Sequence, residues 1–181
     1  MVHQQAVQDL GEVGRGQIMT EGKGQLRISE FWGDNRTERE FEESGLQCCT
    51  RTHELGHRCG YVALPKGHPL FGVNLLDLLD LDSEALDEVD VDGGVTFAKG
   101  TDDMWILGWD AAHCWHIPDP TIMDEWHRRT HEEHPEWSYY EQNSYMVDAD
   151  MAEKETRSLA RQLAAMWLPI KEGETGGTHQ A

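Results

Sequence analysis

The clearest hydrophobic pattern lies near the C-terminus, where apolar positions recur at helical spacing. Met151, Leu159, Leu163 and Met166 fall on one stripe, with Thr156 on the same face. This spacing predicts an amphipathic helix over residues 148–167. An aspartate at position 148 or 150 is a suitable N-cap, and the proline at position 169 marks its end.

Shorter apolar runs in the middle of the chain predict strands. Cys59–Leu64 is a strand candidate that stops at a proline, and the runs Val95–Ala98 and Met104–Trp109 flank a polar loop. The last two predict an antiparallel hairpin over about residues 95–109. Asp119-Pro120 is typical of a helix start and predicts a helix over residues 120–134, before Pro135.

Strands followed by a C-terminal helix favour the α+β class, with a small antiparallel sheet packed by the two predicted helices. We expect one domain over residues 30–170. Residues 1–29 hold five glycines among polar residues, which predicts a flexible arm, and residues 171–181 predict a disordered tail. The Leu-, Asp- and Glu-rich stretch 75–86 predicts one or two short helices.

Charge narrows the range of partners. The chain carries 34 acidic and 15 basic residues, a formal net charge of −19. Such a field repels phosphate backbones and anionic membranes, so direct nucleic-acid binding is disfavoured and basic protein surfaces or metal cations are favoured. The sequence has neither a signal-peptide pattern nor a long apolar run, and two of its four cysteines are adjacent. The expected location is a reducing cytoplasm.

One motif resembles a zinc protease signature. His53-Glu54-Leu55-Gly56-His57 has the H-E-x-x-H form. On a helix, His53 and His57 would share one face and bind Zn²⁺, with Glu54 as the base for a metal-bound water. The context argues against this, because Gly56 lies inside the motif, Ala63 stands where a third ligand would fall, and a strand is predicted from Cys59. The alternative is a polar loop entering that strand.

A structural zinc site is a further interpretation of the same region. Cys48, Cys49 and Cys59 lie close along the sequence to the two histidines. Thiolates and imidazoles are the usual ligands of structural zinc. The C-x2-C spacing typical of such sites is missing.

Four segments in order resemble a family of small uncharacterised proteins of actinobacteriophages. The segments are Cys59-Gly-Tyr-Val62, Pro65-Lys-Gly-His-Pro-Leu-Phe-Gly72, Val91-Asp-Gly-Gly-Val-Thr-Phe97 and Trp105-Ile-Leu-Gly-Trp-Asp-Ala-Ala-His113. The resemblance covers about residues 57–120 and, loosely, 146–167. Asp92 departs from the family, which has His there, and Ala111 departs where the family has Cys. The resemblance implies a phage protein in an infected bacterial host, but no activity.

The residues of these segments predict a polar site. Asp92 precedes a Gly-Gly turn at a strand start, while Asp110 and His113 follow the partner strand, so the hairpin would bring them together. We expect ligand-binding residues there: His68, Asp92, Thr96, Trp109, Asp110 and His113. Asp110 and His113 are also candidate metal ligands, with a divalent metal such as Zn²⁺ as the cofactor. Turn capping and core packing are the structural alternatives for these residues.

Three functions from different classes follow. The first is a phage accessory protein that binds a host protein or a small molecule, and acts against host defence. The second is a metal-dependent hydrolase that uses His53, Glu54 and His57, or the His/Asp set. The third is an acidic decoy that mimics nucleic-acid charge and blocks a basic partner. The sequence leaves the ligand, the oligomeric state and enzymatic activity open.

Overall fold

A five-stranded antiparallel sheet organises the chain, in the order β1-β2-β3-β5-β4. The structure is a computed structural model that describes residues 26–78, 86, 89–135 and 143–167. Its strands are β1 Thr37–Glu43, β2 Leu46–Thr52, β3 Arg58–Leu64, β4 Phe97–Gly100 and β5 Trp105–Asp110. Its helices are η1 Ile28–Phe31, α1 Leu75–Leu78, α2 Glu125–Glu133 and α3 Ala149–Trp167. The expected α+β class with a small antiparallel sheet is confirmed.

The expected hairpin is formed by β4 and β5, where Phe97 pairs with Gly108 and Gly100 with Trp105. On its other side β5 pairs with β3, from Cys59 opposite Asp110 to Leu64 opposite Trp105. The two apolar runs and the third at Cys59–Leu64 therefore lie side by side in the sheet.

The first hairpin, β1 with β2, was not expected from the sequence. β1 reads Thr-Glu-Arg-Glu-Phe-Glu-Glu, so its charges hide the strand pattern. As an edge strand it tolerates charged side chains. The sequence feature that indicates this hairpin is its turn. Ser44 and Gly45 both have positive φ, 52° and 79°, as a two-residue hairpin turn requires.

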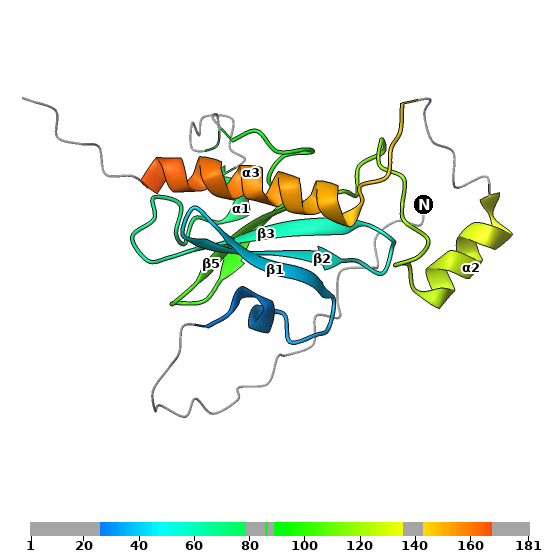
Figure 1. Ribbon diagram of the computed structural model, residues 1–181, viewed down its shortest axis with the longest axis horizontal. Helices are drawn as coiled ribbons and strands as arrows, with labels where there is room; N and C mark the ends of the chain where they lie inside the picture. The colour runs from blue at the N-terminus through cyan, green and yellow to red at the C-terminus, as the bar shows by residue number, and fades with distance from the viewer. Residues whose placement is uncertain (1–25, 79–85, 87–88, 136–142, 168–181) are drawn as a thin grey trace, which may run out of the picture.

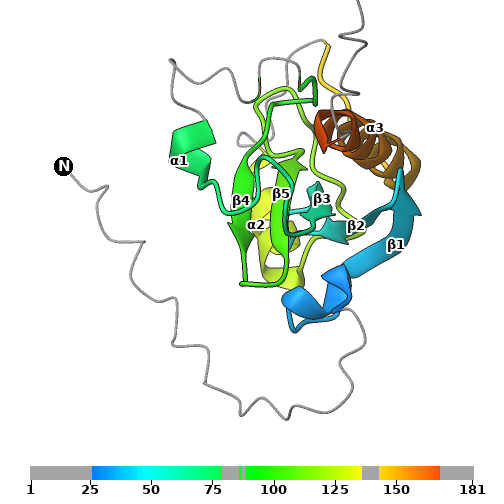
Figure 2. The same cartoon turned by 90° about the vertical axis from the view of Figure 1, so that its left-hand side faces the viewer.

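Helix α3 lies across one face of the sheet, as Figures 1 and 2 show. Leu159 and Leu163 are fully buried beneath it, against Val62, Leu107 and Trp109 of the central strands. Gly60 permits this approach, because a Cβ there would lie 1.9 Å from Oγ1 of Thr156 and 2.3 Å from Nε1 of Trp109. The core therefore depends on close packing of α3 against β3.

The opposite face is covered by η1 and the residue that follows it. Ile28 is fully buried with Cys49, Ala63 and Ile106, and Trp32 lies against Tyr61 and Phe97. The expected arm over residues 1–29 is therefore too long at its C-terminal end. Residues 1–25 and the expected tail over 171–181 lie outside the described residues.

The two remaining helices lie at the periphery. α2 begins later than expected because Asp124, and not Asp119, caps it by accepting a hydrogen bond from the N–H of His127. It contributes no buried residue, and in Figure 1 it extends beyond the end of the sheet. α1 occupies the start of the expected helical stretch 75–86, of which residues 79–85 lie outside the described part. No helix among the described residues has the length and apolarity needed to cross a membrane.

Candidate functional site

Three chain segments meet at the end of the sheet where β5 finishes. The segment after β5 pairs with residues near the start of α3, since the N–H of Ile117 donates to the Tyr145 carbonyl and that of Tyr145 to the Trp115 carbonyl. The Asp92–Gly93–Gly94 turn before β4 is the third segment. Its backbone is tied to α3 by a 2.8 Å hydrogen bond from the Asp92 N–H to Oε1 of Glu155.

The carboxylate of Asp92 is the centre of this meeting point. Its Oδ2 accepts hydrogen bonds from Nε2 of His116 at 2.8 Å and from the hydroxyl of Tyr145. Its Oδ1 has one longer contact, 3.4 Å to Nε1 of Trp115. Three aromatic side chains from the other two segments thus converge on one acid.

His116 is held in one tautomer. Its ring is buried, and the N–H of His113 donates to its Nδ1 at 3.4 Å. Because Nδ1 accepts, the proton lies on Nε2 and points at Asp92. His116 therefore donates from Nε2 and orients the carboxylate.

These contacts keep Asp92 ionised. Burial by itself raises the pKa of Asp92, but the hydrogen bonds from Tyr145 and His116 outweigh it, so the pKa lies below the usual value. The same hydrogen bond raises the pKa of Tyr145 to about 12. At neutral pH the site contains a carboxylate and a protonated phenol.

His113 lies beside this network, between Gly93 and Trp115. Its ring stacks on Trp115 at 4.7 Å with an interplanar angle of 16°. A Cβ on Gly93 would lie 1.9 Å from Cε1 of His113, so only glycine leaves room for the ring. Nδ1 of His113 is buried and has no hydrogen-bond partner in the described part of the chain.

We call the group formed by these residues the Asp92 site: Asp92, Gly93, His113, Trp115, His116 and Tyr145. Of the residues expected to bind ligand, Asp92 and His113 are brought to it. His116 and Tyr145 were missed. The backbone pairing of residues 115–117 with 145 forms only in the folded chain, so no local pattern could reveal it.

Trp109 and Asp110 do not join one pocket. Successive residues of a strand point to opposite faces. Trp109 is buried under α3, where its Nε1 donates to Oγ1 of Thr156. Asp110 follows on the other face, and its carboxylate caps the turn by accepting from the N–H of Ala112. Asp110 therefore has the structural role of capping a turn, which was the alternative to binding a ligand.

Thr96 and His68 also support the fold and do not join the Asp92 site. The N–H of Thr96 extends the hairpin by donating to the Gly108 carbonyl. His68 is buried: its Nε2 lies 2.9 Å from the Leu163 carbonyl, and its Nδ1 accepts from the N–H of Leu70. Burial lowers the pKa of His68, which keeps it neutral. It anchors the Pro- and Gly-containing loop to α3 instead of reaching Asp92.

The H-E-x-x-H motif is not helical, so the geometry of a zinc protease does not form, and the structure has the alternative of a polar loop entering β3. β2 ends at Thr52 and β3 begins at Arg58, and the motif forms the turn between them. The N–H of His53 donates to the His57 carbonyl, and Gly56 has φ +88°. A helical pair of ligands four residues apart therefore does not form.

The cysteines are also poorly placed for a zinc site. Cys48 and Cys49 are buried on opposite faces of β2, as strand alternation requires. Burial raises the pKa of Cys48 and Cys49 to about 12 and that of Cys59 to about 11, which disfavours thiolates. The described residues include no group of three His, Cys, Asp or Glu side chains arranged to hold a metal.

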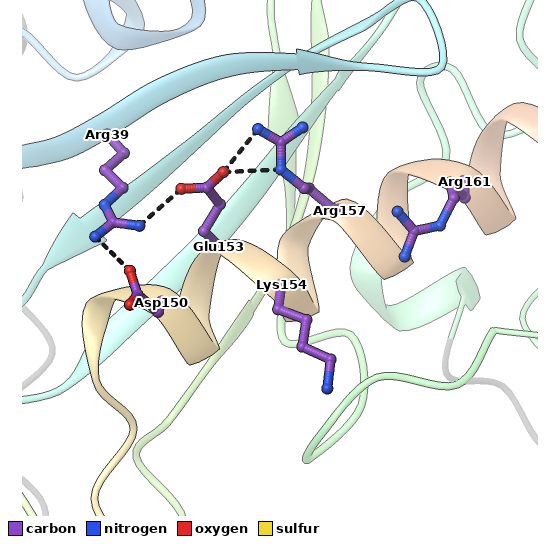
Figure 3. A pocket seen from close by; sticks show the side chains of 6 residues that line it. All are labelled: Arg39, Asp150, Glu153, Lys154, Arg157 and Arg161. Atoms are coloured by element: carbon purple, nitrogen blue, oxygen red, sulfur yellow. Dashed lines mark hydrogen bonds and ion pairs between the residues drawn. The ribbon is translucent and has the colours of Figure 1, made fainter.

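A separate hollow of about 290 Å³ lies between β1 and α3. Figure 3 shows Glu153 between the guanidinium groups of Arg39 and Arg157. These ion pairs measure 2.8 Å to Arg39 and 2.7 Å to Arg157, and Arg157 also pairs with Glu43 of β1 at 3.1 Å. The arginines are matched by carboxylates of the same chain, so the hollow links the edge strand to α3.

Comparisons of the chain with family models, with curated proteins and with solved structures give no match. The Asp92 site is therefore interpreted from its own geometry.

Proposed function

We propose that the protein is a phage accessory protein that binds a component of its bacterial host through the Asp92 site. One observation carries this proposal. An ionised carboxylate is held by aromatic donors, two of which, Trp115 and Tyr145, remain partly exposed. Oriented polar groups beside exposed aromatic rings are typical of recognition surfaces.

The geometry favours binding over catalysis. Both ring nitrogens of His116 are engaged, Nδ1 by the His113 N–H and Nε2 by Asp92, so neither is left to contact a substrate. Tyr145 keeps its proton because its pKa is about 12. Among the described side-chain contacts of the Asp92 carboxylate, each group acts as a donor, which fixes the acid instead of activating a nucleophile.

The phage assignment is supported by the position of the resemblance. The segments 91–97 and 105–113, which resemble actinobacteriophage proteins, supply Asp92, Gly93 and His113 of the site. The hydrolase alternative has no comparable support, because its H-E-x-x-H motif forms a hairpin turn and, among the described residues, its His/Asp set is not arranged to hold a metal.

Photocrosslinking in bacterial cells that produce the protein tests the proposal. A benzophenone amino acid replaces Trp115 in one protein and Trp126, an exposed tryptophan on α2, in another. We expect one host component to crosslink from position 115 and not from position 126. Equal crosslinking from both positions, or none from position 115, would contradict binding at the Asp92 site.

A further inference from the structure

The surface around Asp92 combines exposed aromatic and thioether groups with acid. Trp115 is 39% exposed, Tyr145 38% and Met146 43%. One face of the Trp115 indole is stacked on His113, and the residue as a whole remains partly exposed. Trp, Tyr and Met are enriched in the centres of protein interfaces.

The charge at this surface is negative. Glu155 accepts the Asp92 N–H and adds a second carboxylate, close enough to contribute to the raised pKa of Tyr145. Among the described hydrogen bonds and ion pairs of Asp92, Glu155 and Tyr145, none involves Lys or Arg. This contrasts with Asp34, Glu38 and Asp119, each of which pairs with an arginine. A cation is therefore the complementary ligand, and a phosphate is repelled.

Asp92 retains capacity to accept another hydrogen bond. Oδ2 already accepts from His116 and Tyr145, whereas Oδ1 has only the 3.4 Å contact with Trp115. An ionised carboxylate oxygen has two lone-pair positions. A donor that contacts the Trp115 ring would lie near this oxygen, because Nε1 of the same ring is 3.4 Å from it.

We infer that the host component is a basic protein segment and that one of its arginines binds at the Asp92 site. This inference rests on the proposed function. In this arrangement the planar guanidinium stacks on the face of Trp115 opposite His113 and donates to Oδ1 of Asp92. A guanidinium suits this geometry better than an ammonium, because it stacks on aromatic rings and donates through a planar fork. The net charge of −19 steers such a segment toward the protein.

The test uses the full chain with the indole N–H groups of its tryptophans observed by NMR. It is titrated with an acetylated, amidated Gly-Gly-Arg-Gly-Gly peptide and with the same peptide carrying citrulline, the neutral isostere of arginine. We expect the Trp115 signal, assigned by its loss in Trp115→Ala, to shift with the arginine peptide. Citrulline should weaken binding by about twofold to thirtyfold, the range of a cation–π contact.

Variants locate the contact. Trp115→Leu keeps an apolar side chain without the π face and should weaken binding of the arginine peptide, as should Asp92→Asn. Trp126→Ala on α2 is the matched control and should bind like the wild type. Equal affinity for the two peptides, or loss of affinity in Trp126→Ala alone, would overturn the inference.

The two proposals fail in different ways. If position 115 crosslinks to a small molecule, to nucleic acid or to a protein while the arginine peptide shows no preference over citrulline, the arginine inference is wrong and binding at the site stands. If position 115 crosslinks to nothing and the peptide does not bind, the proposed function fails as well.

Discussion

Nε2 of His116 lies 2.8 Å from Oδ2 of Asp92, and this hydrogen bond joins the turn before β4 to the segment after β5. His116 is buried and its other ring nitrogen accepts a backbone N–H, so the imidazole is a fixed donor. The orientation of Asp92 is therefore set before any ligand arrives. Pre-organisation of this kind lowers the entropy cost of binding.

Replacing Asp92 with Asn tests this network through its pH dependence. The amide has one acceptor oxygen in place of two, so the variant should lose about 1–2 kcal/mol of unfolding free energy at pH 7. The folded-state pKa of Asp92 lies below its ordinary value of 3.8. Its contribution to stability is thus present above that value and is lost as the pH falls through the lower, folded-state pKa.

Urea unfolding at pH 7, 5 and 3 measures this difference between wild type and Asp92→Asn. It should be constant from pH 7 to 5 and shrink at pH 3. Asp103→Asn, at an exposed pair with Lys66, is the control and should change stability little. A difference that grows on acidification would contradict an ionised, hydrogen-bonded Asp92.

The contact between Gly93 and His113 can be isolated by a double-mutant cycle. Gly93→Ala places a Cβ 1.9 Å from Cε1 of His113 and at φ +77°, so it adds a clash to backbone strain. Gly94→Ala, at φ +82° with no heavy atom within 4 Å of its Cβ, suffers strain alone, about 1–2 kcal/mol.

We expect Gly93→Ala to destabilise more than Gly94→Ala in the wild type, and this excess to shrink in a His113→Ala background. Thermal unfolding of the single and double variants gives the coupling free energy. Additive effects of Gly93→Ala and His113→Ala would mean that the ring does not lie over Gly93.

His68 should behave as a structural residue. His68→Ala removes a buried ring and leaves the Leu163 carbonyl and the Leu70 N–H without their partners. We expect a loss of about 2–4 kcal/mol in unfolding free energy, by chemical denaturation. Crosslinking from position 115 should persist at temperatures where the variant is folded. Unchanged stability with lost crosslinking would assign His68 to the site instead.

The elements foreseen from the sequence are those whose apolar pattern matches their burial. α3, β3 and β5 are buried along stripes or runs, so their positions could be predicted, although Met151 of the expected α3 stripe is exposed. β1 could not be found in this way, because it is an edge strand whose seven residues include five charges. Its signal lay in the Ser44-Gly45 turn and not in the strand itself.

The candidate site was foreseen only in part. Asp92 and His113 were expected together, and the Gly93 turn does bring them to one place. Trp109 and Asp110 could have been separated from the sequence alone, since neighbouring residues of a strand point to opposite faces of the sheet. His116 and Tyr145 could not be assigned, because their pairing joins segments 29 positions apart along the chain (145 minus 116).

Native mass spectrometry of protein isolated from producing bacterial cells tests binding at the Asp92 site most directly, with wild type beside Trp115→Ala and His68→Ala. The account predicts a bound host component on the wild type and on the folded fraction of His68→Ala, and none on Trp115→Ala. Retention of that component by Trp115→Ala at wild-type occupancy would contradict it.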